Sequence, residues 1–280
     1  MMHDSSNWLQ DFKSNIYSQG GEDGIIKKAL DTLPTNDKWC VEFGAWDGLH
    51  LSNTRNLIEN YGYNAVAIEG NSERYNILKK NYEENKQVIG INAFVGFSES
   101  DGLDTILAGT SIPENFDFLS IDIDGNDYHA WKAMHRYAPK LVCIEFNPTI
   151  HTDIDFVQRP DPSINHGASL SALVRLGKEK NYELICVLPL NAIFIHRDFF
   201  DLFQISDNSP INLRIDTDHV THIFAGYDGT VFLRGNSTML WHGISLKESR
   251  CQQIPSFLRS YPGNYNLVQR MIFKLFRLFL

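Results

Sequence analysis

The stretch LSIDIDGNDYHAW, residues 119–131, places three carboxylates within six positions, directly after an apolar run. Asp122, Asp124 and Asp127 could bind a divalent cation, act as a general base or form a turn. A calcium loop counted from Asp122 needs glycine at its sixth position and glutamate at its twelfth, where Asp127 and Ala133 stand. The pattern therefore excludes an EF-hand and leaves a looser Mg²⁺ or Mn²⁺ site open.

Strand geometry separates the three acids into two kinds. On an extended strand Asp122 and Asp124 point to one side, and the isoleucines beside them point to the other. A Gly-Asn turn follows, so that Asp127 can cap a helix that begins near Tyr128. We expect two functional acids at a strand end and one helix cap, and we assign no metal ligand.

The acids belong to an alternation of apolar runs and helical segments between residues 38 and 150. Continuous apolar strands separated by helices predict a parallel sheet that is covered on both faces. We therefore predict a doubly wound, mostly parallel α/β fold, which binds its ligand at the carboxyl ends of the strands. The expected strands are 38–45, 63–70, 86–97, 116–124 and 140–147, and the expected helices are 51–62, 71–85 and 128–137.

Beyond residue 147 the pattern changes. Residues 148–168 are rich in proline and polar side chains and predict a long loop of the kind that often binds or covers a ligand. A helix over 169–181 and an antiparallel pair of strands at a sheet edge follow, whereas 200–266 has no clear periodicity. We divide the chain into an N-terminal cap segment (1–36), a cofactor-binding core (37–205), an accessory or substrate region (206–266) and an amphipathic C-terminal helix (267–280).

The composition is that of an ordinary globular protein, with 43% hydrophobic and 21% charged residues. The net charge of −9 argues against a nucleic-acid partner, which normally requires a basic surface. Cys40, Cys143 and Cys186 lie in apolar runs and predict buried, reduced thiols. We find no secretory signal and no run near the roughly 18 apolar residues of a membrane span, so we expect a cytoplasmic protein.

Polar residues also end the first two expected strands. The segment VEFGAWDG supplies Glu42, Gly44 and Gly48 in a tight strand-to-helix turn, and Glu69 ends the second strand. Glycines there let a ligand approach the backbone, and a strand-end acid at this separation typically binds ribose hydroxyls. The turn lacks the G-x-G-x-x-G spacing of a dinucleotide site, and the chain lacks a Walker lysine. These features favour a cofactor with ribose and adenine but no phosphate, namely S-adenosylmethionine.

The ordered segments CVEFGAWDGLHLSNT, AIEGN, NAFVG, SIDIDGNDY and IEFN resemble the class I S-adenosylmethionine-dependent methyltransferases, and most closely the FkbM-type branch. The resemblance covers roughly residues 15–200 and includes an upstream YSQGGEDGII segment. Glu42 stands where many FkbM-type proteins have aspartate, which keeps the charge. The resemblance implies a Rossmann-like methyltransferase fold, and the residues themselves predict its antiparallel edge hairpin.

The same resemblance assigns roles to individual residues. Residues that flank the methionine moiety would be Glu42, Gly44 and Gly48, with Asp122 facing its amino group or the substrate. Glu69 would bind the ribose hydroxyls, and the end of the third strand would lie near the adenine. That strand end is Asn92 and Ala93.

The upstream segment SQGGED has two readings. By resemblance, Gln19, Glu22 and Asp23 would close over the cofactor. Alternatively, the same residues would begin a helix, with the acids placed favourably at the positive end of its dipole.

Methyl transfer to a sugar hydroxyl needs a general base, because the pKa of that hydroxyl is far above neutral. The candidates are Asp124, Glu145 at the end of the fifth strand, and His166 at the end of the long loop. A histidine has a pKa suited to this role, although loop histidines are often incidental. No histidine pair has helical metal-ligand spacing.

The C-terminal segment LVQRMIFKLFRLFL, residues 267–280, spaces three cations on one helical face among apolar side chains. Such a helix resembles an interfacial membrane anchor. A terminal helix that docks on the body of the protein or in a homo-oligomer interface fits the pattern equally well.

From these features we expect an S-adenosylmethionine-dependent O-methyltransferase that acts on a sugar hydroxyl or sugar-linked group of a surface glycan or its precursor. The glycan is implied by resemblance to the family and not by a pocket read from the residues. Two alternatives remain open: a metal-assisted transferase for a phosphate- or nucleotide-bearing substrate, and a non-catalytic binding module of the same fold.

Overall fold

The computed structural model of the protein describes residues 5–278 and divides into two compact units, Met1–Asp216 and Thr217–Leu280. The first unit includes residues 206–216 together with the expected core. Helix α7 (Pro210–Leu213) belongs to it because the side chain of Leu213 is fully buried in the core. The guanidinium of Arg214 donates to the carbonyl oxygens of Pro148 and Ile150, at 2.6 and 2.8 Å.

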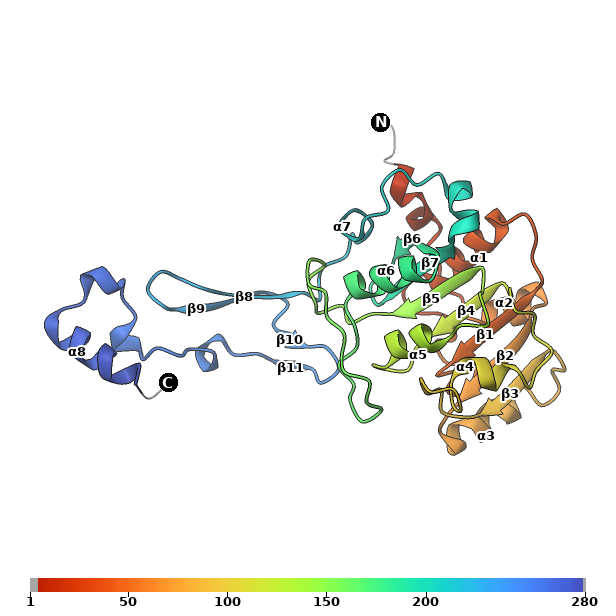
Figure 1. The fold of residues 1–280 in the computed structure, drawn as a ribbon, viewed down its shortest axis with the longest axis horizontal. Helices are drawn as coiled ribbons and strands as arrows, with labels where there is room; N and C mark the ends of the chain where they lie inside the picture. Colours follow the sequence, from red (N-terminus) through yellow and green to blue (C-terminus); the bar gives the residue numbers. More distant parts are fainter. Residues whose placement is uncertain (1–4, 279–280) are drawn as a thin grey trace. The chain divides into compact units, whose positions relative to one another are not determined.

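A seven-stranded sheet forms the centre of the first unit, in the order β3-β2-β1-β4-β5-β7-β6 (Figure 1). Strands β1 to β5 are parallel, whereas β7 is antiparallel to both β5 and β6. The predicted doubly wound, mostly parallel sheet with an antiparallel edge hairpin is confirmed. The strands are β1 (Trp39–Phe43), β2 (Asn64–Glu69), β3 (Val88–Asn92), β4 (Phe118–Ile121), β5 (Leu141–Glu145), β6 (Tyr182–Val187) and β7 (Asn191–His196).

Helices cover both faces of this sheet, and each face has its own apolar core. Alternation along the strands produces the two cores, because successive side chains point to opposite faces. On one face lie η1 (Ser5–Phe12), α1 (Glu22–Thr32), α2 (Arg55–Tyr61), α3 (Ser72–Asn81) and η2 (Arg197–Phe203), and on the other lie α4 (Leu103–Leu107), α5 (Asp127–Ala133), α6 (Leu170–Glu179) and α7. Cys40, Cys143 and Cys186 are buried and free, as predicted.

Several helix boundaries differ from the prediction for local reasons. Helix α2 begins at Arg55 instead of residue 51, because residues 52–54 turn to bind the carboxylate of Glu42. Helix α5 ends at Ala133 instead of residue 137, because Asp104 accepts the backbone N–H groups of residues 135 and 136. Helix α3 begins after Asn71, whose side chain accepts hydrogen bonds from the backbone N–H groups of residues 73 and 74. Helix α4 was not predicted.

An ion-pair network ties the amino-terminal ends of the central strands together. The Lys140 ammonium donates to Asp117 and to Asp37, each at 2.8 Å. Asp117 is fully buried and also accepts the backbone N–H groups of Asp37 and Lys38. Because each group has charged partners and further hydrogen bonds, the buried charge is compensated.

The second unit contains little regular structure, as the absence of periodicity in the sequence predicted. It consists of short strands and 3₁₀ turns that lead to one helix, α8, whose side chains are all at least partly exposed. Among residues 5–278 no helix is long and apolar enough to cross a membrane. The elements are β8 (Thr221–Ala225), β9 (Val231–Gly235), β10 (Thr238–Met239), β11 (Ile244–Ser245), η3 (Glu248–Arg250), η4 (Ser256–Leu258), η5 (Pro262–Asn264) and α8 (Leu267–Phe276).

Candidate functional site

The turn after β1 packs directly against the end of β4. Gly44 has a φ of +77°, and a Cβ at this position would lie 1.7 Å from the carbonyl oxygen of Asp122. Gly48 has a φ of +75° and faces the ring of Tyr82, which would be 2.5 Å from an added Cβ. Both glycines predicted from the sequence therefore stand where a side chain does not fit. The result is a tight strand-to-helix turn whose backbone packs closely against the end of β4 and the Tyr82 ring.

Glu42 holds the remainder of this turn in place. Its buried carboxylate accepts hydrogen bonds from the Ser52 hydroxyl, the Asn53 backbone N–H and the Thr54 hydroxyl, the last two at 2.8 Å. Burial raises the pKa of Glu42, and these three hydrogen bonds oppose the increase. The carboxylate thus shapes the β1–α2 loop, whatever else it contacts.

Glu69, at the end of β2, is arranged around backbone donors. One carboxylate oxygen accepts the Trp46 N–H at 2.9 Å and the other accepts the Asn71 N–H at 2.7 Å. The carboxylate therefore joins the β1–α2 turn to the start of α3. Each oxygen retains a further lone pair that could accept a ligand hydroxyl.

The predicted adenine region is joined to the same place. The side-chain amide of Asn92 donates to the backbone carbonyl of Glu69 at 2.7 Å, and the Ala93 N–H donates to the same oxygen at 3.2 Å. The Asn92 side chain is thereby committed to the β2–β3 junction, and its Oδ1 also accepts the Ser72 hydroxyl.

Two exposed aromatic side chains flank Glu69 and were not singled out from the sequence. Phe94 is 79% exposed, although its ring lies against Gly70, where an added Cβ would be 2.3 Å away. Trp46 is 42% exposed and has a φ of +49°, an uncommon conformation for a bulky residue. Both residues lie inside the segments GAWDG and NAFVG, so their aromatic character was visible but their orientation was not.

Three carboxylates converge at the ends of β4 and β5. One oxygen from each of Asp122, Asp127 and Glu145 lies within 4.8 Å of the others. Asp127 accepts the backbone N–H groups of Ile123 and Gly125, at 2.9 and 2.8 Å. The side chains of Asp122 and Glu145 make no hydrogen bond or ion pair within residues 5–278.

This geometry revises the two roles expected for the acids. The cap residue of α5 is Asn126, and Asp127 is the first helical residue, whose carboxylate holds the preceding turn together. The predicted cap is therefore displaced by one position, because the carboxylate bonds to backbone N–H groups before the helix. Asp127 consequently faces Asp122 and Glu145 instead of lying apart from the cluster.

Crowding of like charges and burial raise the pKa values of all three acids. Burial is the largest cause for each, followed by the negative neighbours for Asp122 and Glu145. The pKa of Asp127 rises to about 6, with its backbone hydrogen bonds opposing the increase. The cluster therefore retains protons at neutral pH unless a cation neutralises it, and hard divalent cations favour such oxygen ligands.

Glu22, at the first position of α1, reaches toward the same end of the sheet. Its buried carboxylate accepts the side-chain amide of Asn191 at 3.0 Å and the Gly20 N–H at 2.6 Å. Asn191 lies directly opposite Glu145 in the β5–β7 pairing, so the two side chains share one face of the sheet. The structure thus brings Glu22 near the acid cluster, through a residue that the sequence did not indicate.

The rest of SQGGED forms the entry to α1. Asp23 accepts the backbone N–H groups of residues 16–18 on one carboxylate oxygen, each within 2.8 Å. Its role is to shape this segment, in agreement with the helix-start alternative. The side chain of Gln19 is exposed, and the Asn15 side-chain amide donates to the backbone carbonyl of Gln19 at 3.0 Å.

The long loop 148–168 folds back toward the ends of β4 and β5, where it carries His166 and contacts the segment that holds Asp124. Asn165 donates to the carbonyl of Asp124 at 2.7 Å, and Asn147, just after β5, donates to the carbonyl of His166 at 2.9 Å. Gln158 accepts the His166 N–H at 2.7 Å and so fixes its backbone. Asp124 and His166 both have exposed side chains, and Asp124 has a φ of +57°.

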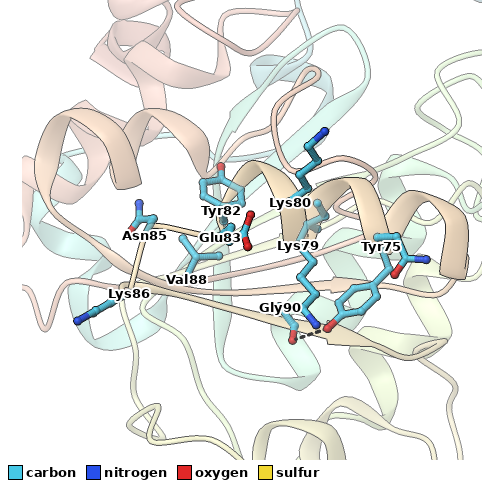
Figure 2. Close-up of a pocket in the computed structure, with 11 residues that line it drawn as sticks. Tyr75, Lys79, Lys80, Tyr82, Glu83, Asn85, Lys86, Val88 and Gly90 are labelled. Carbon is cyan, nitrogen blue, oxygen red and sulfur yellow. Dashed lines mark hydrogen bonds between the residues drawn. The ribbon is translucent and has the colours of Figure 1, made fainter.

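A separate hollow of about 500 Å³ lies between α3 and the edge strand β3 (Figure 2). Lysines 79, 80 and 86 and Tyr75 line it, and the Tyr75 hydroxyl donates to the Gly90 carbonyl at 3.4 Å. None of the predicted site residues lines this hollow. We do not assign it a function.

No protein-family model matches the sequence, and no curated protein sequence matches it significantly. Solved structures give weak matches. The N-terminal domain of EvdMO1, in the presence of S-adenosylhomocysteine and D-fucose, is 9% identical over 69% of this chain and 94% of that chain, with a TM-score of 0.41. An S-adenosylmethionine-dependent methyltransferase from Aquifex aeolicus is 12% identical over 68% of this chain and 97% of that chain, with a TM-score of 0.39.

The CurJ carbon methyltransferase is 10% identical over 65% of this chain and 56% of that chain, with a TM-score of 0.43. This chain is similar to these methyltransferases in its general architecture. At such identities and TM-scores the likeness establishes nothing about activity, which depends on the chain's own residues.

Proposed function

We propose that this protein is an S-adenosylmethionine-dependent O-methyltransferase of the FkbM type. The observation that supports it most is the Gly44 turn, which leaves no space for a side chain against the end of β4, beside Glu69 at the end of β2. A ligand that carries ribose and adenine but no phosphate fits these groups, because the turn has neither the spacing nor the lysine of a phosphate site.

The cofactor would lie across the carboxyl ends of β1, β2 and β4. Glu69 would accept the ribose hydroxyls with its remaining lone pairs. Trp46 and Phe94, exposed on either side of Glu69, would cover the adenine and shield it from water. Glu42 would act on the cofactor mainly through the loop that it holds, since three donors already occupy its carboxylate.

Bound S-adenosylmethionine would supply an electrophilic methyl group, so the protein must align an acceptor oxygen and remove its proton. Asp124 and His166 suit this task, because both side chains are exposed on segments that hydrogen bonds hold beside the ends of β4 and β5. The raised pKa of Glu145 keeps its carboxyl protonated, which makes it a hydrogen-bond donor to the acceptor in preference to a base.

The proposed acceptor is a sugar hydroxyl of a surface glycan or its precursor. Its support is the resemblance of the ordered motifs to FkbM-type enzymes. A sugar also suits the polar strand ends, because the clustered Asp122 and Glu145 and the exposed Asp124 offer several hydrogen-bonding oxygens to hydroxyl groups.

Calorimetric titration with S-adenosylhomocysteine tests the cofactor. We expect binding, and we expect Glu69→Gln to weaken it at least tenfold, since a charge-assisted hydrogen bond contributes about 1.5–3 kcal/mol. Glu73→Gln, on the exposed first turn of α3, is the matched control and should bind normally. No binding by the unaltered protein would refute the proposal.

Turnover tests the acceptor side. Once glycan screening identifies an acceptor, Asp124→Asn and His166→Ala should retain cofactor binding, and loss of the base should reduce kcat by about 10²–10⁴-fold. A variant that loses both binding and turnover would place its residue with the cofactor.

The cluster of Asp122, Asp127 and Glu145 favours a second candidate, a metal-assisted transferase for a phosphate-bearing substrate. Titration with Mg²⁺ and Mn²⁺ in the absence of cofactor distinguishes it. Binding that Glu145→Gln abolishes would support this candidate, and failure to bind either ion would remove it.

A further inference from the structure

Helix α8 is attached to the second unit by one narrow face. Gln269 donates to the backbone carbonyl of Phe257 at 3.0 Å, and the Phe273 ring meets the Tyr265 ring edge-on at 5.5 Å. A capping box between Asn266 and Gln269 satisfies backbone groups at the start of the helix. The first turn of the helix is therefore capped and held against the second unit, although all side chains of the helix remain at least partly exposed.

The opposite face of α8 is apolar and open. Residues separated by three or four positions lie on the same side of a helix, so these apolar side chains form one continuous stripe. Their exposed fractions range from 37% to 78%. They are Leu267, Val268, Met271, Ile272, Leu275 and Leu278.

Cations border this stripe, and acids are absent from its surroundings in the sequence. Arg270, Lys274 and Arg277 recur at intervals of four and three, which places them along one edge of the stripe. No Asp or Glu follows Glu248 in the entire sequence. Residues 217–280 contain seven Lys and Arg against three Asp and Glu, in a protein whose net charge is −9.

We propose that α8 is a peripheral anchor that lies in the surface of an anionic lipid bilayer. The apolar stripe would enter the boundary between headgroups and acyl chains, and the three cations would contact lipid phosphates. A lipid surface offers negative charge directly beside apolar volume, which matches the arrangement on the helix. An antiparallel second copy of the helix fits less well, because pairing the stripes in that orientation would bring like-charged edges together.

This inference is independent of the proposed methyl transfer, since neither cofactor nor acceptor residues take part. The test is flotation of the full chain with phosphatidylcholine vesicles that contain, or lack, about a quarter phosphatidylglycerol. We expect binding to the anionic vesicles and a decrease of that binding as salt is raised.

Two variants separate the apolar contribution from the charged one. Met271→Ser with Leu275→Ser should lower the partition coefficient at least tenfold, because both side chains are mostly exposed and would enter the lipid. Lys274→Gln with Arg277→Gln should lower it about fivefold per cation. Ile211→Ser with Ile215→Ser, at equally exposed positions of the first unit, is the matched control and should bind normally.

Circular dichroism of each variant establishes that the fold is retained. Binding unchanged by the α8 substitutions, or equal binding to neutral and anionic vesicles, would overturn the proposal. A second outcome would also overturn it: the unaltered chain forms a dimer in buffer, detected by light scattering, and does not bind vesicles, and Met271→Ser with Leu275→Ser dissociates that dimer. That outcome would assign the stripe to a second copy of the chain.

Discussion

Helices α6 and α8 are each ten residues long and strongly amphipathic, yet they use their apolar faces differently. Six residues of α6 are buried, among them Leu173 at 0% exposure, whereas no residue of α8 is buried. The two units also differ in the sign of their charge, since the first is acidic and the second is basic. Residues 1–216 contain 31 Asp and Glu against 18 Lys and Arg, and residues 217–280 contain three against seven.

This difference teaches that amphipathicity alone does not indicate what a helix faces. The sheet covers the apolar face of α6, which therefore contributes to folding. The apolar face of α8 remains open and is available for a surface outside the chain. The first unit should thus carry the stability of the protein, and the second its attachment.

The largest expected effect on stability comes from removing a buried charge in the first unit, which tests whether this unit carries the stability of the protein. Lys140→Met leaves fully buried Asp117 without its cation and should cost about 3–5 kcal/mol of unfolding free energy. Urea denaturation measures the loss. The control Arg136→Ala removes an exposed ion pair to Glu114 and should cost at most about 1 kcal/mol. Equal effects would contradict the assignment of stability to buried pairing.

A second test compares two glycines of the first unit that share a positive φ. Gly44→Ala places a Cβ against the Asp122 carbonyl, whereas nothing lies within 4 Å of a Cβ at Gly62. Both variants incur the cost of a left-handed conformation, so their difference measures the close approach. We expect Gly44→Ala to lose about 2 kcal/mol more unfolding free energy than Gly62→Ala. We also expect it to lose S-adenosylhomocysteine binding. Retained binding would show that the Gly44 turn does not contribute to cofactor binding.

The acid cluster gives a pH-dependent test of the same unit. The folded-state pKa of Glu145 is raised above its unfolded value, so the folded protein holds the proton more tightly. Stability is therefore fully present below the unfolded pKa and falls as pH rises. Glu145→Gln should remove this loss, so that its stability relative to the unaltered protein increases by at least about 1 kcal/mol as pH rises from about 5 toward the raised pKa of about 10.

Urea denaturation in a chelating buffer measures this difference. Glu73→Gln, on the exposed first turn of α3, is the control and should leave the pH profile unchanged. A profile that Glu145→Gln does not alter would show that the carboxylates are neutralised in some other way.

The smallest expected effect concerns the second unit. Met271→Ser with Leu275→Ser should change the unfolding free energy by less than about 0.5 kcal/mol per site, because the side chains are mostly exposed. Thermal denaturation in buffer measures it. A large loss of stability would mean that the stripe is covered within the protein, and the contrast between α6 and α8 would disappear.

The sequence predicted the elements whose signals are local. Alternating apolar runs located the five parallel strands, and the β6–β7 pair was recognised as antiparallel. Both Asn71 and Ser72 are residue types that favour a helix start, and the structure uses Asn71 as the cap. Glu42, Gly44 and Glu69 were selected from their spacing, and the structure brings Gly44 and Glu69 to the same turn.

Features that depend on distant contacts were missed. The start of α2 depends on the capture of Ser52 and Thr54 by Glu42, which no local pattern records. The partnership of Asn191 with Glu22 joins residues far apart in sequence. The position of Phe94 was also missed, because its residue type does not indicate a ring that lies against Gly70 and yet remains 79% exposed.

The ion pairs of Lys140 bear on which parts of the sequence can tolerate substitution during evolution. Its pairing with Asp117 and Asp37 fastens the amino-terminal rim of the sheet, on the side opposite the predicted ligand. Substitutions at the carboxyl-terminal rim, around Asp124 and His166, leave that fastening untouched. Selection for a new ligand can therefore act on one rim of the sheet while the other rim preserves the stability of the fold.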